Sequence, residues 1–304
     1  MDVVIIVWCD ASTLSKCEGV IKNLGWERLD SARTLADGVY EIKGQTMHYS
    51  DTQALGAALN TAFEPLQPLD VNWQLDNVFR SHKRLAVFDM DSTLIQQEVI
   101  DEIARDAGIV DKVAAITESA MNGEIDFKES LKRRVALLEG TSVAVLERVR
   151  ERITFTPGAR ELCKALKKLG YKLAVISGGF LPLANYVKYE LGLDYAFANQ
   201  LQVSADGTTL AGTTFGPVVD GVRKSELLEV IAQTEGITHR DQIIAVGDGA
   251  NDLLMLSKAG LGIAFNAKPR VQAQAEYRLN QDSLHNILYL LGFTSQDIQK
   301  LLSA

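Results

Sequence analysis

The sequence predicts an α/β protein in two parts: a Rossmann-like parallel sheet, with helices on both faces and an inserted helical cap, and a smaller N-terminal α+β domain. Three observations predict this fold. From residue 85 onward, short apolar strands alternate with helical segments, which is the pattern of a buried parallel sheet. Each of the first strands ends in acidic, serine or glycine residues, at the edge where such sheets bind ligands. Residues 1–80 instead follow the order βαββαβ.

The N-terminal part is predicted to be a domain of residues 1–80. Its expected elements, in order, are strand 3–8, helix 12–24, strands 39–42 and 46–49, helix 53–63 and strand 71–75. This order resembles small regulatory modules of the ACT type, so we expect a regulatory or a dimerisation domain and consider a homodimer. No residue of this part marks a ligand site, which leaves a packing role equally open. The polar, basic run 80–84 is expected to be a linker.

The larger domain is predicted to span residues 81–304. Its first expected strands are 85–88, 172–176 and 242–246. The insertion at about 98–155 has a wholly helical pattern and is too long for a simple crossover, so we expect a small cap over the carboxyl ends of the strands. A hairpin is expected within 201–220, because Asp206-Gly207 is a turn signal.

Composition excludes several classes of protein. The 304 residues carry a formal net charge of −8 and contain no long stripe of lysine and arginine, which argues against a nucleic-acid binder. No run of about 18 apolar residues occurs, and no basic segment precedes the first apolar stretch, so neither a membrane span nor a signal peptide is expected. Cys9, Cys17 and Cys163 include no C-x-x-C pair, so we expect neither disulfides nor a zinc site, and a reducing cytoplasm.

Asp89 and Asp91 end the first strand of the larger domain. Two close carboxylates beside an apolar core resist ionisation unless a cation lies between them, which implies a hard divalent ion, Mg²⁺ above all. They could instead be turn or helix caps. A calcium loop is excluded, because Leu94 and Ile100 stand where glycine and glutamate are required. The third interpretation is a phosphoryl site, in which one carboxylate attacks phosphorus and the other moves a proton.

A second acidic run, Gly247–Asp252, follows another predicted strand. It begins like a dinucleotide fingerprint, but Asp252 stands where that motif needs glycine or alanine for close packing. Tight glycine turns with acids suit the second half of a Mg²⁺ site instead, with Asp248 as a ligand and Asp252 in support.

Two further segments could bind phosphate. Ser177-Gly178-Gly179 alone is an ordinary turn, yet at the end of a parallel strand its hydroxyl and backbone N–H groups could hold phosphate oxygens. Lys224 opens a helix, where a solvated lysine is the ordinary outcome; pointed into the site, it would neutralise both phosphate and Asp89. Neither a G-x-S-x-G elbow nor a P-loop motif occurs, which disfavours a serine hydrolase and a P-loop NTPase.

In order and spacing, these segments resemble the four motifs of the haloacid dehalogenase superfamily, and about residues 85–290 are similar to its phosphoserine phosphatase branch. The resemblance implies hydrolysis of O-phospho-L-serine, the last step of L-serine biosynthesis, with Asp89 as nucleophile and Asp91 as general acid and then base. The other implied roles are Mg²⁺ binding by the Asp89 side chain, the Asp91 carbonyl and the Asp248 side chain; phosphate binding by Ser177, Gly178, Gly179, Lys224 and Asn251; and substrate recognition by Glu98, Met121, Phe127 and Arg134.

The sequence gives some independent support for Arg134 and little for Glu98. Arg134 lies on the apolar stripe of the predicted helix 126–138, whereas a solvating arginine usually lies opposite; an arginine extending from the edge of the stripe remains an alternative. Glu98 opens a helix, where an acid is expected from the helix dipole in any case. In the roles that the resemblance implies, Arg134 would bind a carboxylate and Glu98 an ammonium group. A phosphorylated amino acid carries both groups and therefore fits the site. Phosphothreonine, phosphohomoserine or another small ester stays open, since one methylene changes binding by about 1–3 kcal/mol.

Overall fold

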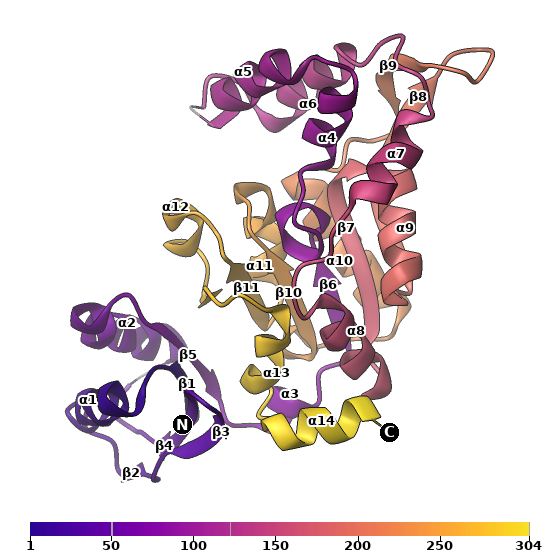
Figure 1. Ribbon diagram of the computed structural model, residues 1–304. Coiled ribbons are helices and arrows are strands. Elements are labelled where there is room, and N and C mark those ends of the chain that lie inside the picture. The colour runs from indigo at the N-terminus through magenta and orange to yellow at the C-terminus, as the bar shows by residue number, and fades with distance from the viewer. Residues whose placement is uncertain (50, 122, 304) are drawn as a thin grey trace.

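The computed structural model describes residues 1–49, 51–121 and 123–303, and the side chain of Met121 is outside this description. The chain forms two separate sheets, an N-terminal sheet and a main sheet. Figure 1 shows the N-terminal sheet at the lower left, the main sheet in the middle and a group of helices above it. The predicted α/β class, with a helical insertion, is confirmed.

The N-terminal sheet is antiparallel, in the order β2-β4-β1-β5, with β3 paired to β4. Its elements are β1 (Asp2–Trp8), α1 (Ala11–Lys22), β2 (Arg28–Leu29), β3 (Arg33–Ala36), β4 (Val39–Gln45), α2 (Thr52–Phe63) and β5 (Asp70–Leu75). Alternate residues of β1 pack in two directions: Val3 and Ile5 join the core under α1 and α2, while Val4 and Ile6 join the core of the main sheet. Burial on both faces explains why the first strand is a continuous apolar run.

The first of the two strands predicted here, 39–42, is part of a longer strand, β4, which runs through Gly44 to Gln45, and the second, 46–49, is wrong because these residues form no strand. Gly44 pairs with Val3 on one side and Leu29 on the other, so it does not form a turn. A Cβ at this position would lie 2.5 Å from the ring of Trp26. The glycine therefore makes room for a packed indole, and the short strands β2 and β3, which the sequence pattern missed, complete the sheet.

The main sheet has the order β12-β11-β10-β6-β7-β8-β9, parallel except for β9. Its strands are β6 (Leu85–Phe88), β7 (Lys172–Phe180), β8 (Tyr195–Val203), β9 (Leu210–Phe215), β10 (Ile243–Gly247), β11 (Leu261–Phe265) and β12 (Tyr277–Leu279). The three strands expected from the sequence are β6, β7 and β10, which are neighbours at its centre.

Helices cover both faces of the main sheet, as predicted. Alternate strand residues pack against α8 (Ala159–Lys168) and α9 (Leu181–Leu191) on one face, and against α10 (Gly221–Thr234) and α11 (Leu253–Lys258) on the other. The remaining helices are α3 (Val78–Ser81), α12 (Pro269–Gln272), α13 (Ile287–Leu290) and α14 (Ser295–Ser303). No helix in the described ranges combines the length and apolarity needed to cross a membrane.

The expected cap is present and wholly helical, made of α4 (Val99–Asp106), α5 (Val110–Met121), α6 (Phe127–Ala136) and α7 (Val145–Arg152). The predicted hairpin, β8 and β9, extends from the main sheet to join it (Figure 1). Backbone hydrogen bonds link Gly140 N–H to the Leu210 carbonyl and Leu210 N–H to the Thr141 carbonyl. The cap is therefore held at the hairpin as well as at its own two chain connections.

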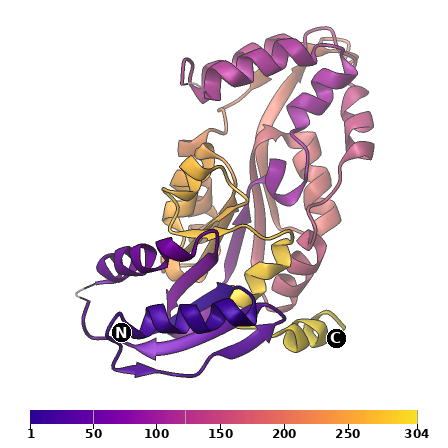
Figure 2. The same ribbon diagram turned by 60° about the vertical axis from the view of Figure 1, so that its left-hand side comes forward.

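Two residues of the expected linker 80–84 are buried, because Arg80 and Lys83 are each only 6% exposed. Arg80 forms a buried ion pair with Glu41 and donates to the carbonyl of Leu290. The edges of the two sheets also meet here: the side-chain amide of Asn72 donates to the Arg278 carbonyl (2.8 Å) and accepts from the Arg278 N–H (3.1 Å). Figure 2 shows the N-terminal sheet against the C-terminal segment of the chain.

Candidate active site

Asp89 lies at the carboxyl end of β6, and a tight turn, Met90–Leu94, carries the chain away from the sheet. Its Oδ1 accepts a 2.7 Å hydrogen bond from the Met90 N–H, and Lys224 Nζ lies 2.7 Å from the same oxygen. Oδ2 has no hydrogen bond to the described residues. The Asp89 carboxylate is thus held through Oδ1, and Oδ2 is free to contact a ligand.

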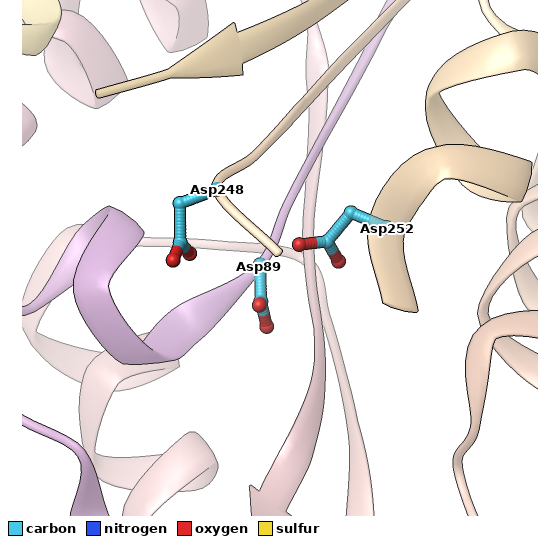
Figure 3. A group of neighbouring side chains, drawn as sticks. All are labelled: Asp89, Asp248 and Asp252. Carbon is cyan, nitrogen blue, oxygen red and sulfur yellow. The ribbon is translucent and has the colours of Figure 1, made fainter. Parts of the chain in front are cut away.

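The carboxylates of Asp89, Asp248 and Asp252 meet in one cluster, with oxygen atoms within 4.8 Å of one another. Figure 3 shows the three side chains converging from different segments of the chain. Burial and the charge of Asp252 raise the pKa of Asp248 to about 7, and the same two causes raise the pKa of Asp89. Ionising these groups together needs a cation, and a set of carboxylate oxygens suits a hard divalent ion.

Thr93 is a residue of this cluster that sequence reasoning did not single out. It is fully buried, and its hydroxyl donates a 3.0 Å hydrogen bond to Asp248 Oδ1. Hydrogen bonds of this kind orient metal-binding carboxylates. The sequence shows that Thr93 lies two residues after Asp91. Its hydrogen-bond partner, however, is 155 residues away in the chain, and the two side chains meet only because β6 and β10 are neighbouring strands.

Lys224 is fully buried and not on the surface, so the ordinary interpretation of a helix-opening lysine is wrong here. Its Nζ lies 2.7 Å from both Asp89 Oδ1 and Asp252 Oδ1. Burial by itself lowers the pKa of Lys224, but the charges of Asp252 and Asp89 raise it above its usual value. The ammonium is therefore a fixed positive charge beside Asp89. Gly247 leaves room for this arrangement, since a Cβ there would lie 2.5 Å from Asp252 Oδ2.

The Ser177-Gly178-Gly179 segment ends β7 beside the same cluster. Ser177 is fully buried and its Oγ accepts from the Gly179 N–H at 2.8 Å. A Cβ on Gly178 would lie 2.8 Å from the ring of Phe127, and one on Gly179 would lie 3.1 Å from Asp91 Oδ2. Gly178 thus allows Phe127 of the cap to approach closely, and Gly179 allows Asp91 to do so.

Asp91 is half-buried, and its Oδ1 is a buried atom with no hydrogen-bond partner among the described residues. Burial, followed by the charges of Glu98 and Asp89, raises its pKa well above the usual value. Both effects favour the protonated carboxyl, which is the form a general acid needs.

A cavity of about 180 Å³ lies between the cap and the carboxyl ends of the strands. The sequence-predicted residues that line it are Asp89, Asp91, Glu98, Phe127, Arg134, Gly178, Gly179, Asp248 and Asn251. A larger neighbouring cavity, about 740 Å³, shares part of this lining and adds Asp101, Ser130, Lys268 and Arg270. Met121 was also predicted to line the pocket; it ends α5, and its side chain lies outside the described part of the structure.

Glu98 and Arg134 place opposite charges on the cap side of this cavity. The Ser92 hydroxyl donates to Glu98 Oε1 at 2.8 Å, and burial raises the pKa of Glu98. Burial lowers the pKa of Arg134, while the charges of Asp101, Glu98 and Asp91 act in the opposite direction. Arg134 forms no ion pair with a described residue, and its Nε only reaches the Ser130 carbonyl at 3.4 Å. Its guanidinium is thus available to a ligand.

Asp101 and Ser92 are the other site residues that sequence reasoning missed. Asp101 follows Glu98 by three residues on α4, so helical spacing could have indicated that both face the cavity. Ser92 gave no such signal, because it reaches Glu98 only through a left-handed backbone conformation, φ +55°.

Comparisons with known proteins agree with this geometry. The model of a hydrolase family, haloacid dehalogenase-like hydrolase, matches residues 83–260. A probable phosphoserine phosphatase of Schizosaccharomyces pombe is 55% identical over 234 residues, which is 77% of this chain and 78% of that protein. The crystal structure of a HAD family hydrolase from Salmonella enterica serovar Typhi matches with a TM-score of 0.81 and 31% identity, over 95% of this chain and 98% of its own. A phospho-aspartyl intermediate analogue of phosphoserine phosphatase matches with a TM-score of 0.64 and 49% identity, over 68% of this chain and 98% of its own.

Proposed function

The chain belongs to the haloacid dehalogenase-like hydrolase family, and we propose that it hydrolyses O-phospho-L-serine to L-serine and phosphate in a Mg²⁺-dependent reaction, the last step of L-serine biosynthesis. One observation carries the proposal: a single cavity is lined by Asp89 and Asp91 and also by Glu98 and Arg134. That arrangement provides phosphoryl chemistry beside groups that bind an ammonium and a carboxylate. The phosphoserine phosphatases among the relatives support the same substrate.

The donor set fits Mg²⁺, because three carboxylates are gathered and, among the described residues, only Lys224 forms ion pairs with them. The Asp89 side chain, the Asp91 carbonyl and the Asp248 side chain would hold the ion, with Thr93 orienting Asp248. When bound, the ion would neutralise charge on the transferring phosphoryl oxygens.

In the first half of the reaction, Asp89 attacks phosphorus. A bond forms between a carboxylate oxygen and phosphorus while the bond from phosphorus to the serine oxygen breaks. Asp91 gives its proton to the departing oxygen, which releases L-serine and leaves a phosphoryl group on Asp89. Lys224, 2.7 Å from Asp89 Oδ1, offsets negative charge throughout this step.

In the second half, Asp91 accepts a proton from a water molecule, whose oxygen attacks phosphorus. The bond between phosphorus and the Asp89 oxygen breaks, inorganic phosphate leaves, and both carboxyl groups return to their starting forms. Ser177, the Gly178 and Gly179 backbone and Asn251 would bind the phosphate oxygens. The cap, which must open to admit substrate, would keep bulk water out during the first half.

The proposal includes a cytoplasmic location. Cys9, Cys17 and Cys163 are all free thiols, and the latter two are buried, which suits a reducing compartment. The proposed partner is a small phosphorylated amino acid.

A trapping experiment tests the chemical half of the proposal. Phosphoserine labelled in its phosphate is mixed with enzyme and Mg²⁺, and the reaction is quenched in acid within one turnover. We expect a protein-bound label that hydroxylamine removes, as an acyl phosphate requires, and none in Asp89→Asn. An Asp89→Asn enzyme with full activity would refute a nucleophilic Asp89.

A substrate panel tests the specificity half. Arg134→Ala should lower kcat/KM for phosphoserine by about 10²-fold, since a charge-assisted pair contributes about 3 kcal/mol, and should change the hydrolysis of phosphoethanolamine, which has no carboxylate, much less. Arg133→Ala is the matched control, because Arg133 is exposed on the same helix and paired with Glu129. Equal losses on both substrates would refute the carboxylate role of Arg134. Faster hydrolysis of phosphothreonine or the phosphate ester of homoserine would favour the alternative substrates.

A further inference from the structure

A second cavity, about 190 Å³ in volume, lies between the N-terminal sheet and the main sheet. Its walls include Trp73 of β5, Arg80 and Lys83 around α3, and Asp241 and Glu276 before β10 and β12. Lys83 precedes β6, whereas Asp89 follows that strand, so the second cavity lies at the opposite end of β6 from the active site. Figure 1 shows α3 at the end of the molecule away from the cap. The two cavities share no lining residue.

Lys83 is the unusual group in this wall. Its side chain is almost fully buried, and its Nζ donates a 2.8 Å hydrogen bond to the backbone carbonyl of Asp241. No described carboxylate lies within ion-pair distance of its Nζ, although the charge of Asp241 acts to raise its pKa, and two of its three N–H donors have no acceptor among the described residues. A buried charge without a counter-ion is costly, and burial accordingly lowers the pKa of Lys83 to about 8.

Other nearby acids are paired with arginines, and Asp241 lies 3.6 Å from the ring of His239. Glu276 lies 3.5 Å from Arg240, and Arg80 pairs with Glu41 and with Asp76. Trp73 also lines the cavity, and its indole N–H makes no hydrogen bond to the described residues; part of its ring packs in the core of the N-terminal sheet, where a Cβ on Gly56 would lie 2.9 Å from it. The wall thus offers an ammonium that has no ion-pair partner among the described residues, together with an aromatic residue.

We propose that this cavity binds a small organic carboxylate, with Lys83 as its counter-ion and the Trp73 ring as the wall for its carbon atoms. A carboxylate carries one negative charge, which matches Lys83, the one cation among the described lining residues without an ion pair. A phosphate dianion would bring a second charge toward Asp241 and Glu276, which also line the cavity. The ligand would touch both sheets and the segment that connects them, so its binding would stabilise their contact.

Fluorescence of Trp73 tests the proposal on the full chain. The chain has three tryptophans, so the double variant Trp8→Phe, Trp26→Phe leaves only the indole that lines this cavity. The variant is titrated with sodium acetate, and separately with inorganic phosphate, at constant ionic strength. We expect a saturable change with acetate, and a midpoint at least tenfold higher once Lys83→Met is added. Lys83→Arg, which keeps the charge, should retain the response.

Two controls separate this site from others. Arg84→Met removes an exposed neighbouring cation that does not line the cavity, and Arg134→Ala removes the carboxylate-binding cation of the active site; neither should move the acetate midpoint. In the chain with all three tryptophans, acetate should raise the Tm, and Lys83→Met should abolish that rise. Absence of a saturable response, or an unchanged response in Lys83→Met, would overturn the proposal. Saturation by phosphate at lower concentration than by acetate would overturn the assignment to a carboxylate.

Discussion

Ser92 shows how a single hydroxyl can set substrate recognition. It holds Glu98 Oε1 at 2.8 Å, and it does so from φ +55°, a conformation that non-glycine residues rarely adopt. Strain of this kind at an active site usually has a function. Here the strained turn carries the hydroxyl to the carboxylate expected to bind the ammonium of the substrate.

Removing this hydroxyl should weaken binding of the amino group specifically. We expect Ser92→Ala to raise the KM for phosphoserine roughly tenfold, because a hydrogen bond to a charged group contributes about 1.5 kcal/mol, with little change for the phosphate ester of 3-hydroxypropanoate, which lacks the amino group. Ser92→Gly should give the same KM change, since it also removes the hydroxyl but relieves the backbone strain. A proportional loss on both esters would show that Ser92 does not act through Glu98.

Lys83 gives a pH-dependent prediction for stability. Its pKa is about 8 in the folded protein and near 10.5 when unfolded, so between these values the unfolded chain binds more protons and the free energy of unfolding rises with pH. Lys83→Met removes the buried charge and should stabilise the protein at pH 7 by about 1–3 kcal/mol. Urea unfolding in a carboxylate-free buffer should show that the difference in free energy of unfolding between Lys83→Met and the unchanged protein decreases toward pH 10. A constant difference across this range would contradict the assignment.

Many of the site residues were predictable, because each follows a buried parallel strand or belongs to a recognisable motif. Asp89, Asp248 and Lys224 met as expected for that reason. Thr93 and Ser92 were not predictable: one depends on the register of β6 against β10, and the other on a left-handed turn. The sequence shows which strand a residue follows, but it does not show which distant residue becomes its hydrogen-bond partner in the fold.

At the level of elements, Gly44 lies inside β4 and not in a turn. Sequence pattern treats glycine as a turn signal, yet the absent side chain here accommodates Trp26 within a continuous strand. Local sequence cannot distinguish these cases, because the indole comes from outside the strand. The strands β6, β7 and β10 and the helical cap were predictable, since they have strong patterns of their own, whereas β2, β3, β11 and β12 were not placed from the sequence.

A pair of glycine substitutions tests this interpretation. Gly44→Ala should destabilise the protein by about 1–3 kcal/mol through overpacking against Trp26. Gly19→Ala is the matched control: Gly19 lies in α1 with open space around its Cβ position, so alanine should stabilise by roughly 0.5–1 kcal/mol. Both are measured by urea unfolding. Two changes of the same sign would contradict the packing role of Gly44.

At the scale of the whole molecule, the two sheets are joined by buried polar contacts that no composition rule indicated. Glu41, Asn72 and Arg80 belong to the N-terminal sheet and its connecting segment, and each is nearly inaccessible to solvent. The run 80–84 had the composition of an exposed linker, but its charges acquire partners only after the sheets dock. Buried ion pairs of this kind make the docking specific at a cost in desolvation.

Breaking one of these pairs should destabilise the whole chain. Arg80→Met leaves Glu41 with only its longer, exposed contact to Arg33, so we expect a loss of about 3 kcal/mol in the free energy of unfolding. Arg84 is exposed and lies four residues after Arg80, so Arg84→Met should change the free energy of unfolding by less than about 0.5 kcal/mol. Thermal unfolding measures both. A loss as small for Arg80→Met as for Arg84→Met would show that the ion pair does not hold the sheets together.

The contact between Asn72 and Arg278 has a consequence for self-association. β12 is an outermost strand of the main sheet, and its outward N–H and C=O groups at Arg278 are occupied by a side-chain amide instead of another strand. Unprotected edges of this kind recruit strands from other molecules. The N-terminal sheet thus protects this strand edge from pairing with other molecules. We expect a chain truncated to residues 78–304 to aggregate, as measured by light scattering, at concentrations where the full chain does not. Asn72→Leu should cause a smaller increase in light scattering.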